Sequence, residues 1–255
     1  MRFASLGSGS GGNALLIEAG STRILLDCGF GLAEATARLS RAGLEPDDLD
    51  AIIVTHEHDD HGGGVARLAS RHELPVYLTY GTLAALGADR RAVPNAILID
   101  TVTPFAIGAL EVRPYPVPHD AREPVQFVLS DGSARLGVLT DTGRCTPHIA
   151  RALSGMDALV LECNHDLDML MNGPYPVSLK HRVAGRMGHL ANAAAAELLQ
   201  AIDCSRLQHL IAAHLSETNN APHLARAALA GALNCEPEWI GVATQEEGFA
   251  WREII

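Results

Sequence analysis

Residues 51–64 read AIIVTHEHDDHGGG, in which an apolar run leads directly into three histidines and two aspartates. The apolar run predicts a short buried strand. Because alternate residues of an extended segment point the same way, His56 and His58 are placed to hold one metal ion together. Asp60 and His61 lie past the bend and are placed to face a second ion, and imidazole and carboxylate are ligands that suit zinc and similar dications. Burying this many ionisable groups beside a core is costly unless they are paired or bind metal, so the stretch predicts a metal site.

The same order, an apolar strand followed by a potential metal ligand, recurs elsewhere in the chain. The four further positions are Asp27 after residues 24–26, His119 after 110–117, Asp141 after 136–139 and His214 after 210–213. Loops at strand ends are where a rigid scaffold usually presents its chemistry. One segment cannot complete a site for two ions, so we expect these four side chains to join the histidines of residues 56–61.

The remaining apolar runs predict strands early in the chain and strand–helix alternation later. A strand-like run opens at residues 2–3, and further strands are expected over 14–19, 23–26, 51–54, 75–78, 96–100, 110–117, 125–130, 135–139, 158–162 and 207–212, with helices over 32–41, 65–72, 79–86, 191–202 and 224–233. This order, in two similar halves, predicts two sheets packed face to face with helices outside. Because no long linker divides the chain, we expect a single α/β (α+β) domain over residues 1–255.

The composition narrows the class of protein. Hydrophobic residues make up 47% and charged residues 19%, which fits a folded chain with a substantial core. A formal net charge of −11 disfavours non-specific binding to nucleic acid, so contact with phosphate must rest on metal ions and a local basic patch. The five cysteines show no CxxC spacing, and no apolar stretch has the character of a signal peptide or a membrane span. We expect a cytoplasmic enzyme with no membrane contact.

Five short motifs together resemble the metallo-β-lactamase superfamily. They are DCG at residues 27–29, THEHDDH at 55–61, PHD at 118–120, TDTG at 140–143 and AHLS at 213–216, and the likeness extends from Leu6 to His214. The resemblance implies a four-layer αβ/βα sandwich with the site at the edge of the sheets. It also implies a hydrolase that uses two divalent metal ions, for which the ligand chemistry favours Zn²⁺ or Mn²⁺.

The resemblance also assigns the ligands. The residues that it implies are His56, His58 and His119 for the first ion, Asp60, His61 and His214 for the second, and Asp141 as a bridge between them. Asp27 would lie behind the imidazoles and orient them, as carboxylates often do. Two ions would lower the pKa of a water held between them, and the resulting hydroxide would attack the substrate, with Asp60 counted among the catalytic residues.

The full set of ligands resembles that of phosphate-ester hydrolases, including the tRNA 3′-processing nucleases. In that group a histidine just before a helix acts on the scissile phosphate, and a glutamate orients it. His189, before the expected helix over 191–202, and Glu162, at the end of the expected strand over 158–162, match these two places. A histidinium paired with a carboxylate can protonate a leaving alkoxide, so both are assigned as catalytic residues. A helix-capping or surface role is the alternative for His189.

A narrower resemblance concerns the YycJ/WalJ-like subgroup of bacterial nucleases. It rests on SLGSGSGGNA at residues 5–14, LECNHD at 161–166, YPVSLKHRV at 175–183, GHLAN at 188–192 and AHLSETNN at 213–220. The resemblance implies a DNA 5′-exonuclease, that is, a metal-dependent phosphodiesterase with DNA as its partner and a role in DNA repair.

Substrate contacts are expected from three parts of the chain. Lys180 and Arg182 belong to a basic run that is placed to hold backbone phosphate, although such a run is equally typical of a solvated surface. The Gly/Ser-rich loop over residues 7–13, which ends at Asn13, either offers backbone N–H groups to a phosphate or forms a tight turn. His165 is expected to contact the substrate or to have a structural role.

Three other functions remain open. A phosphodiesterase for a small cyclic or nucleotide-like ester would use the same chemistry in a narrower pocket. A lactonase or thioester hydrolase would use the same metal site but would not need the His189 and Glu162 pair. A non-catalytic metal-binding protein would not need a complete ligand set with a bridging Asp141. Aromatic residues are only 4% of the chain, which favours contact with a DNA backbone over stacking on bases but also fits a small ester.

Overall fold

The structure, a computed structural model, describes residues 1–86, 93 and 95–255. Its strands are β1 (Arg2–Gly7), β2 (Ala14–Ala19), β3 (Thr22–Leu26), β4 (Ala51–Ile53), β5 (Val76–Thr79), β6 (Ala96–Ile99), β7 (Phe105–Ile107), β8 (Leu110–Pro116), β9 (Val125–Ser130), β10 (Arg135–Leu139), β11 (Ala158–Glu162), β12 (His209–Ala213), β13 (Gly241–Val242) and β14 (Phe249–Glu253). Its α-helices are α1 (Leu32–Arg41), α2 (Asp59–Gly62), α3 (Val65–His72), α4 (Tyr80–Ala85), α5 (Pro147–Leu153), α6 (Leu167–Asn172), α7 (Val177–Val183), α8 (Asn192–Ala201) and α9 (Pro222–Leu233), and short 3₁₀ helices cover Pro46–Asp48 and Pro237–Trp239. Within the described ranges, no helix combines the length and the apolar character that a membrane span requires.

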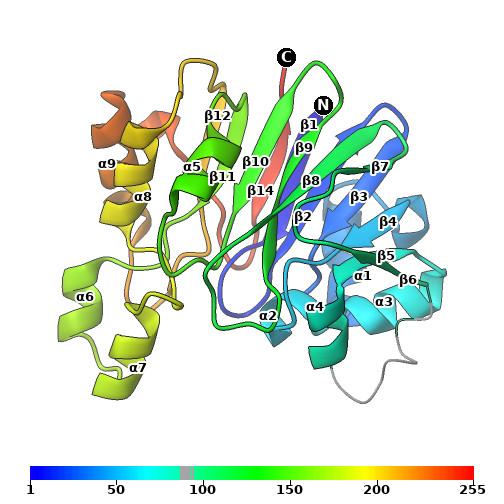
Figure 1. Ribbon diagram of the computed structural model, residues 1–255, viewed down its shortest axis with the longest axis horizontal. Helices are drawn as coiled ribbons and strands as arrows, with labels where there is room; N and C mark the ends of the chain where they lie inside the picture. Colours follow the sequence, from blue (N-terminus) through cyan, green and yellow to red (C-terminus); the bar gives the residue numbers. More distant parts are fainter. Residues whose placement is uncertain (87–92, 94) are drawn as a thin grey trace.

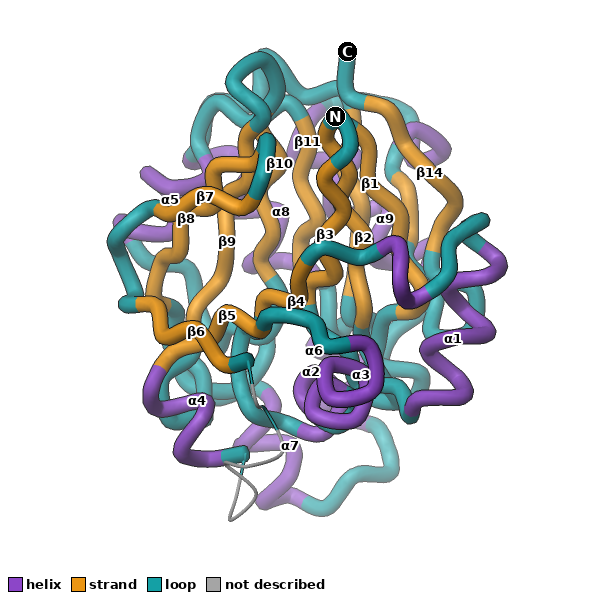
Figure 2. Tube along the Cα trace, turned by 90° about the vertical axis from the view of Figure 1, so that its right-hand side faces the viewer, coloured by secondary structure: helices purple, strands orange, loops and turns teal. Residues whose placement is uncertain are grey.

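Two seven-stranded sheets pack face to face, with helices on both outer sides (Figure 1). The first sheet has the strand order β14-β1-β2-β3-β4-β5-β6, and the second has the order β13-β12-β11-β10-β9-β8-β7. Helices α1, α3 and α4 lie on the side of the first sheet, and α5, α8 and α9 lie on the side of the second. Seen from the side of the first sheet, α1 and α3 lie in front of its strands (Figure 2). The expected four-layer αβ/βα sandwich is thereby confirmed.

Each sheet changes from antiparallel to parallel pairing at its middle. In the first sheet β14, β1, β2 and β3 pair antiparallel, whereas β3, β4, β5 and β6 pair parallel. In the second sheet β7 to β10 pair antiparallel, and β10 to β13 pair parallel. Ligands of such sheets bind outside the carboxyl ends of the strands. The expected metal ligands all follow strands at these ends.

An apolar core that both sheets share lies between them. Phe3, Ile17 and Ile53 come from the first sheet, Phe127 and Val160 come from the second, and all five are buried. A second apolar cluster lies between the first sheet and its helices, and a third lies between the second sheet and its helices. Strands that are buried on both faces are apolar at successive positions, which is why β4 reads AII. Because both halves of the chain contribute to the central core, we propose that residues 1–255 form one domain.

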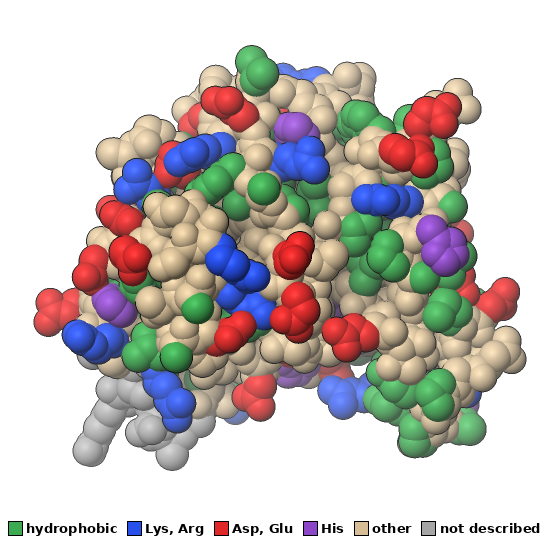
Figure 3. All heavy atoms as spheres, turned by 180° about the vertical axis from the view of Figure 1, so that it is seen from behind, with side chains coloured by type: hydrophobic (Ala, Val, Ile, Leu, Met, Phe, Trp, Pro, Cys, Tyr) green, Lys and Arg blue, Asp and Glu red, His purple; other side chains and the backbone are tan. Residues whose placement is uncertain are grey.

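Helices α6 and α7 stand apart from the four layers, near the edge that carries the site loops (Figure 1). They and the loop after α7 expose large apolar side chains: Leu167, Met171, Val177 and Met187. Seen from behind, apolar side chains gather at the lower right of the molecule, where these two helices lie (Figure 3). This part of the chain therefore lies outside the central core and covers the site from one side.

The structure also contains elements that the sequence patterns did not predict. They are strands β7, β13 and β14 and helices α2, α5, α6 and α7. Most are short: β13 has two residues and α2 has four, which is too few for a hydrophobic period to be recognised. Helix α5 did carry a local signal, because Thr146 caps it by accepting a hydrogen bond from Ile149 N, and Pro147 follows at its first position.

Replacing Phe127 tests the shared core. Phe127 is fully buried between the sheets, and truncation of a buried phenylalanine removes its packing and leaves a cavity. We expect Phe127→Ala to lower the free energy of unfolding by about 3–5 kcal/mol, and Phe127→Leu to lower it much less. Urea denaturation followed by circular dichroism measures both, and equal stability of the wild type and Phe127→Ala would show that the core does not depend on this ring.

Candidate metal centre

Every expected metal ligand lies shortly after the carboxyl end of a strand. Four of them follow β4 and run into α2: His56, His58, Asp60 and His61. The others follow three strands of the second sheet, His119 after β8, Asp141 after β10 and His214 after β12, and Asp27 follows β3 of the first sheet. The packing of the two sheets thus brings five separate segments of the chain to one place.

Two loops of the first sheet are clasped together by backbone hydrogen bonds. Cys28 N donates to His61 O at 2.8 Å, and Gly64 N donates to Cys28 O at 2.8 Å. The loops approach so closely that a Cβ on Gly29 would lie 2.1 Å from Asp60 O. Only glycine fits at such a position. The clasp therefore fixes the backbone of Asp60 and His61 against the loop that follows β3.

Three of the site residues have left-handed backbone conformations. The φ angle is 61° at Asp27, 50° at Asp141 and 56° at His214. Residues other than glycine rarely adopt this region, at a cost of order 1–3 kcal/mol each, and they do so where the surroundings impose it. At two of the three positions hydrogen bonds hold the residue in place: Thr55 donates to the Asp27 carboxylate from both N and Oγ1 at 2.8 Å, and His214 N donates to Ser8 Oγ at 2.9 Å. Strain of this kind is typical of functional sites.

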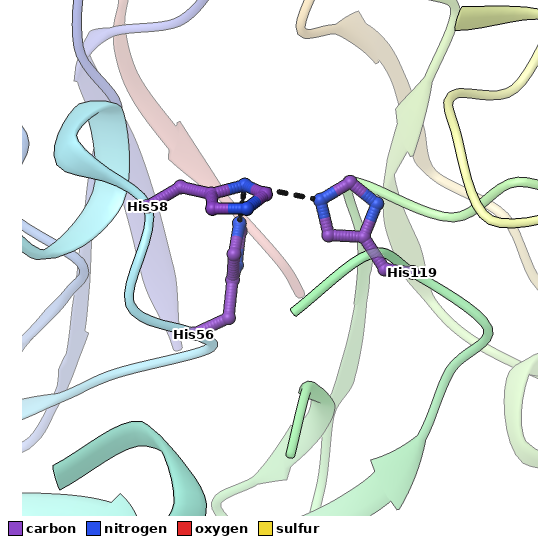
Figure 4. Close-up of side chains that lie close together, drawn as sticks. All are labelled: His56, His58 and His119. Atoms are coloured by element: carbon purple, nitrogen blue, oxygen red, sulfur yellow. Dashed lines mark hydrogen bonds between the residues drawn. The ribbon is translucent and has the colours of Figure 1, made fainter. Parts of the chain in front are cut away.

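Three imidazole rings converge on one point, as Figure 4 shows. His56 Nε2 lies 3.1 Å and His119 Nε2 lies 3.2 Å from His58 Nδ1. On the far side of two rings, His56 Nδ1 lies 2.9 Å from Thr55 Oγ1, and His119 Nδ1 donates to Gly188 O at 3.0 Å. With the proton on Nδ1, each Nε2 presents a lone pair to the shared point. Burial lowers the pKa of both His56 and His119, which keeps these rings in the neutral state that binds metal.

A second group consists of Asp60, His61 and His214. Asp60 Oδ2 lies 3.3 Å from His214 Nε2 and 3.6 Å from His61 Nε2. His61 Nδ1 donates to Asp27 Oδ2 at 2.8 Å, so its Nε2 faces the group. Burial alone would lower the pKa of both histidines, but nearby carboxylates, with Asp141 foremost, hold the pKa of His61 well above its ordinary value and raise that of His214 to about 10. The carboxylates thus draw positive charge to these rings, which a divalent ion supplies as well as a proton does.

Asp141 joins the two groups. Its Oδ2 lies 2.9 Å from His61 Nε2, and its Oδ1 lies 3.6 Å from His214 Nε2 and 3.9 Å from His119 Nε2. Oδ2 is buried and makes no hydrogen bond with any residue in the described part of the chain. Because His61 Nδ1 donates to Asp27, a neutral His61 would turn a lone pair toward Asp141 Oδ2, 2.9 Å from its Nε2, and only a positive charge there, either a proton on Nε2 or a metal ion, makes this contact favourable. A divalent ion supplies that charge to Asp141 and to both groups at once, so these donors fit divalent metal ions.

A histidine–glutamate pair adjoins the metal ligands. His189 Nδ1 lies 2.8 Å from Glu162 Oε1 and 3.3 Å from Asp141 Oδ1. Glu162 is fully buried, and its other oxygen accepts a hydrogen bond from Thr142 N at 2.8 Å, which holds the carboxylate in place. Burial by itself would lower the pKa of His189, but the Glu162 carboxylate outweighs it and raises that pKa above its ordinary value. The expected pairing of these two side chains is present, with the geometry of an acid and the group that orients it.

The ligand groups and His189 border one cleft of about 300 Å³. Its described lining includes four carboxylates, those of Asp59, Asp60, Asp120 and Asp141. Among lysines and arginines, that lining contains Arg182 alone, which α7 presents together with Leu179 and Val183. The cleft is therefore strongly acidic and needs positive charge from metal ions before it can accept a phosphate.

Two polar residues of the site were missed in the sequence. Thr55 Oγ1 lies 2.9 Å from His56 Nδ1 and orients that ring. Asp120 accepts a hydrogen bond from Arg182 Nε at 2.7 Å through Oδ2, and its Oδ1 lies 3.5 Å from His119 Nε2. Both residues directly adjoin a motif histidine in the sequence, which is the signal that would have found them.

Of the four residues that were expected to contact the substrate, one lines the cleft and three do not. Arg182 lines the cleft. Lys180 Nζ instead donates to Met171 O at 2.7 Å and so ties α7 to α6. Asn13 and His165 are only 6% and 1% exposed and are not part of the described cleft lining. We therefore keep Arg182 as a substrate contact and propose structural roles for the other three.

The Gly/Ser-rich loop over residues 7–13 supports the metal ligands. Asn13 Nδ2 donates to Asp60 O at 3.2 Å and lies 3.1 Å from His61 Nε2. The backbone N–H groups of residues 8, 9, 11, 12 and 13 are all bonded to acceptors within the protein. Ser10 is the part of this loop that reaches the described cleft lining. The loop is therefore a tight turn, and it leaves little free backbone to cradle a phosphate.

Comparison with known proteins gives consistent results. Residues 22–214 match the family described as the beta-lactamase superfamily domain. Exodeoxyribonuclease YycJ of Bacillus anthracis is 33% identical over 245 residues, which are 95% of this chain and 93% of that protein. Exodeoxyribonuclease WalJ of Streptococcus pneumoniae is 30% identical over 247 residues, which are 94% of this chain and 91% of that protein. Among solved structures, the metallo-beta-lactamase fold protein YhfI from Bacillus subtilis has a TM-score of 0.74 at 18% identity and covers 98% of both chains, a likeness in fold.

Replacing Asp141 tests the metal centre. Asparagine keeps the size of the side chain and tolerates the left-handed backbone at this position, but it removes the carboxylate charge. We expect Asp141→Asn to lose at least one equivalent of bound divalent metal, as measured by mass spectrometry of the dialysed protein. The exposed Asp168→Asn on α6 serves as the matched control and should keep the wild-type metal content. Full retention of metal by Asp141→Asn would refute the bridging role.

Proposed function

Because the chain belongs to the beta-lactamase superfamily, and within it to the family of the exodeoxyribonucleases YycJ and WalJ, we propose that it is a DNA 5′-exonuclease that uses two divalent metal ions. The names of these relatives, which match nearly the whole chain, support DNA as the substrate. Imidazole and carboxylate ligands support Zn²⁺ or Mn²⁺. The ligands are assigned as His56, His58 and His119 to one ion, Asp60, His61 and His214 to the other, and Asp141 to both.

The single observation that carries this function is the His189–Glu162 pair beside the metal ligands. Hydrolysis of a phosphodiester releases an alkoxide, and a proton donated to that oxygen assists its departure. Glu162 stabilises a proton on His189, which lies 3.3 Å from the Asp141 carboxylate at the cleft. Divalent ions, when bound, stabilise charge on the phosphate oxygens and activate water. A thioester releases a thiolate, which needs no such acid, so the pair favours a phosphodiester substrate.

Arg182 is the residue we assign to the substrate phosphate. Its Nε donates to Asp120 Oδ2 at 2.7 Å, which holds the guanidinium at the cleft and leaves its terminal nitrogens for other acceptors. A guanidinium fork matches the geometry of phosphate oxygens. Arg182 and the metal ions would then hold the ester from two sides.

A small cyclic or nucleotide-like phosphodiester is the second candidate substrate. The cleft, at about 300 Å³, is at the lower end of the range for ligand pockets. The same acid and the same metal ligands would act on such an ester. What separates the two candidates is whether contacts outside the cleft recognise a longer chain of nucleotides.

We also propose a cytoplasmic location and a role in DNA repair. All five cysteines are free thiols, which fits a reducing compartment. Removal of nucleotides from a 5′ end is a reaction that repair requires.

Replacing His189 tests the acid. We expect His189→Ala to lower turnover of DNA by at least ~100-fold, the usual contribution of a general acid, with the metal content unchanged. Steady-state kinetics and metal analysis of the same preparation measure both. The exposed His223→Ala on α9 is the matched control and should behave as the wild type. Loss of metal together with activity would show that His189 is a ligand and would exclude its role as the acid.

Digestion of DNA tests the function itself. Chelator-stripped protein is incubated with 5′-phosphorylated linear duplex DNA, with Zn²⁺ or Mn²⁺ added back separately, and with bis(p-nitrophenyl) phosphate in parallel. We expect shortening from the 5′ end with one of the metals and none with chelator, because the acidic cleft needs divalent charge to bind phosphate. Hydrolysis of the small ester alone would instead support the second candidate.

A further inference from the structure

The outer face of the second sheet carries two arginines that the proposed catalysis does not use. On β8 and β10 alternate residues point into the core between the sheets, which leaves Arg113 and Arg135 on the outer face. Their partners on the intervening strand β9 are Val128 and Ser130. Adjacent strands lie ~4.8 Å apart, so this register places the two guanidinium groups on either side of β9.

Helix α5 adds two more basic side chains to this face. His148 and Arg151 are three residues apart, so they lie on one face of the helix, and both are exposed. A hollow of about 290 Å³ is bordered by α5 and the sheet, and a second of about 370 Å³ is bordered by the sheet alone. The two adjoin, because Arg113, Val128 and Arg135 line both. Together they form one groove, which we call the α5 groove.

The α5 groove carries unbalanced positive charge. Arg113 Nε is paired with Glu111 Oε1 at 2.6 Å. In the described part of the chain, however, no carboxylate forms an ion pair with Arg135 or Arg151. The chain as a whole has a formal net charge of −11. A cluster of unpaired arginines on so acidic a protein is a surface that attracts anions.

The catalytic cleft has the opposite character. It contains four carboxylates and one arginine, whereas the α5 groove contains three arginines and Glu111 as its described carboxylate. Metal ions bound in the cleft offset its negative charge only next to the one ester that they hold. Phosphates further along a polynucleotide therefore need cations elsewhere on the surface, since contacts to phosphate supply most of the affinity for DNA.

We propose that the α5 groove binds the phosphodiester backbone of the DNA substrate, at nucleotides outside the catalytic cleft, an inference that rests on the proposed nuclease function. Arg113 and Arg135 line both adjoining hollows and Arg151 lines one of them, so the arginines border a groove larger than a single small anion needs, which favours a chain of phosphates. Tyr115 in the lining is buried and donates its hydroxyl to Val138 O, so it offers no ring for base stacking. Binding is thus directed to the backbone and independent of sequence.

The test is DNA binding in the presence of chelator, where the cleft cannot hold phosphate through metal. Fluorescence anisotropy of a labelled 5′-phosphorylated duplex gives the Kd at several salt concentrations. For Arg135→Ala/Arg151→Ala we expect a Kd roughly tenfold weaker than that of the wild type, and a slope of log Kd against log salt smaller by about 2, one unit for each lost phosphate contact. Arg135→Lys/Arg151→Lys keeps the charge and should retain most of the slope. Hydrolysis of bis(p-nitrophenyl) phosphate with metal should not change.

The matched control is Arg71→Ala/Arg252→Ala, which removes two exposed arginines that line neither the catalytic cleft nor the α5 groove. If this control weakens binding as much as Arg135→Ala/Arg151→Ala does, only net charge matters and the α5 groove is refuted. Wild-type affinity and salt slope in Arg135→Ala/Arg151→Ala would refute it as well. The binding assay and the nuclease assay can fail separately. If the wild type binds DNA through the α5 groove but never shortens it, the proposed exonuclease function is refuted. If the wild type shortens DNA and the groove variants bind DNA normally, the proposed role of the α5 groove is refuted.

Discussion

The contact between Asp141 and His61 is the point at which the two sheets depend on each other. Asp141 follows β10 of the second sheet, His61 follows β4 of the first, and Asp141 Oδ2 lies 2.9 Å from His61 Nε2. Neither sheet supplies a complete ligand group, because the first sheet's histidines need His119 on one side and His214 on the other. Burying a carboxylate against an imidazole lone pair is costly without added positive charge. Metal binding and the packing of the sheets are therefore coupled, and a bound ion stabilises the folded chain.

The parts of the site that hold these ligands are mainly backbone. The clasp between the loops after β3 and β4 leaves no room for a side chain at Gly29, and Asp27 accepts two hydrogen bonds from Thr55. Left-handed conformations at Asp27, Asp141 and His214 turn each side chain inward directly after its strand. A ligand that is positioned by its backbone loses little freedom when the ion binds, which favours a single geometry.

Charge is divided between two places on the molecule. The cleft concentrates carboxylates at the candidate metal centre, so bound divalent ions must offset this charge before a phosphate can enter. The α5 groove concentrates arginines on the outer face of the second sheet. In a chain of net charge −11, this division allows affinity for a polyanion without neutralising the carboxylates that the metal ions need. Arg182, which Asp120 holds at the cleft, adds one positive charge at the place where we propose that the ester is cleaved.

The layered fold, and the gathering of the expected metal ligands at one edge of it, could be predicted from local patterns in the chain, whereas the His189–Glu162 pair was expected only from the resemblance to phosphate-ester hydrolases. Apolar runs that end in histidine or aspartate are local patterns, and a cluster of these residue types is costly to bury unless its members are paired or bind metal. The directions in which the expected substrate-contacting side chains point could not be predicted. Lys180 and Arg182 are two positions apart on α7, about 200° around a helix at 3.6 residues per turn, so Arg182 lines the cleft while Lys180 bonds to Met171 O. The side on which each one lies depends on how α7 packs against the rest of the molecule, and that rotation is set by contacts between segments far apart in the chain.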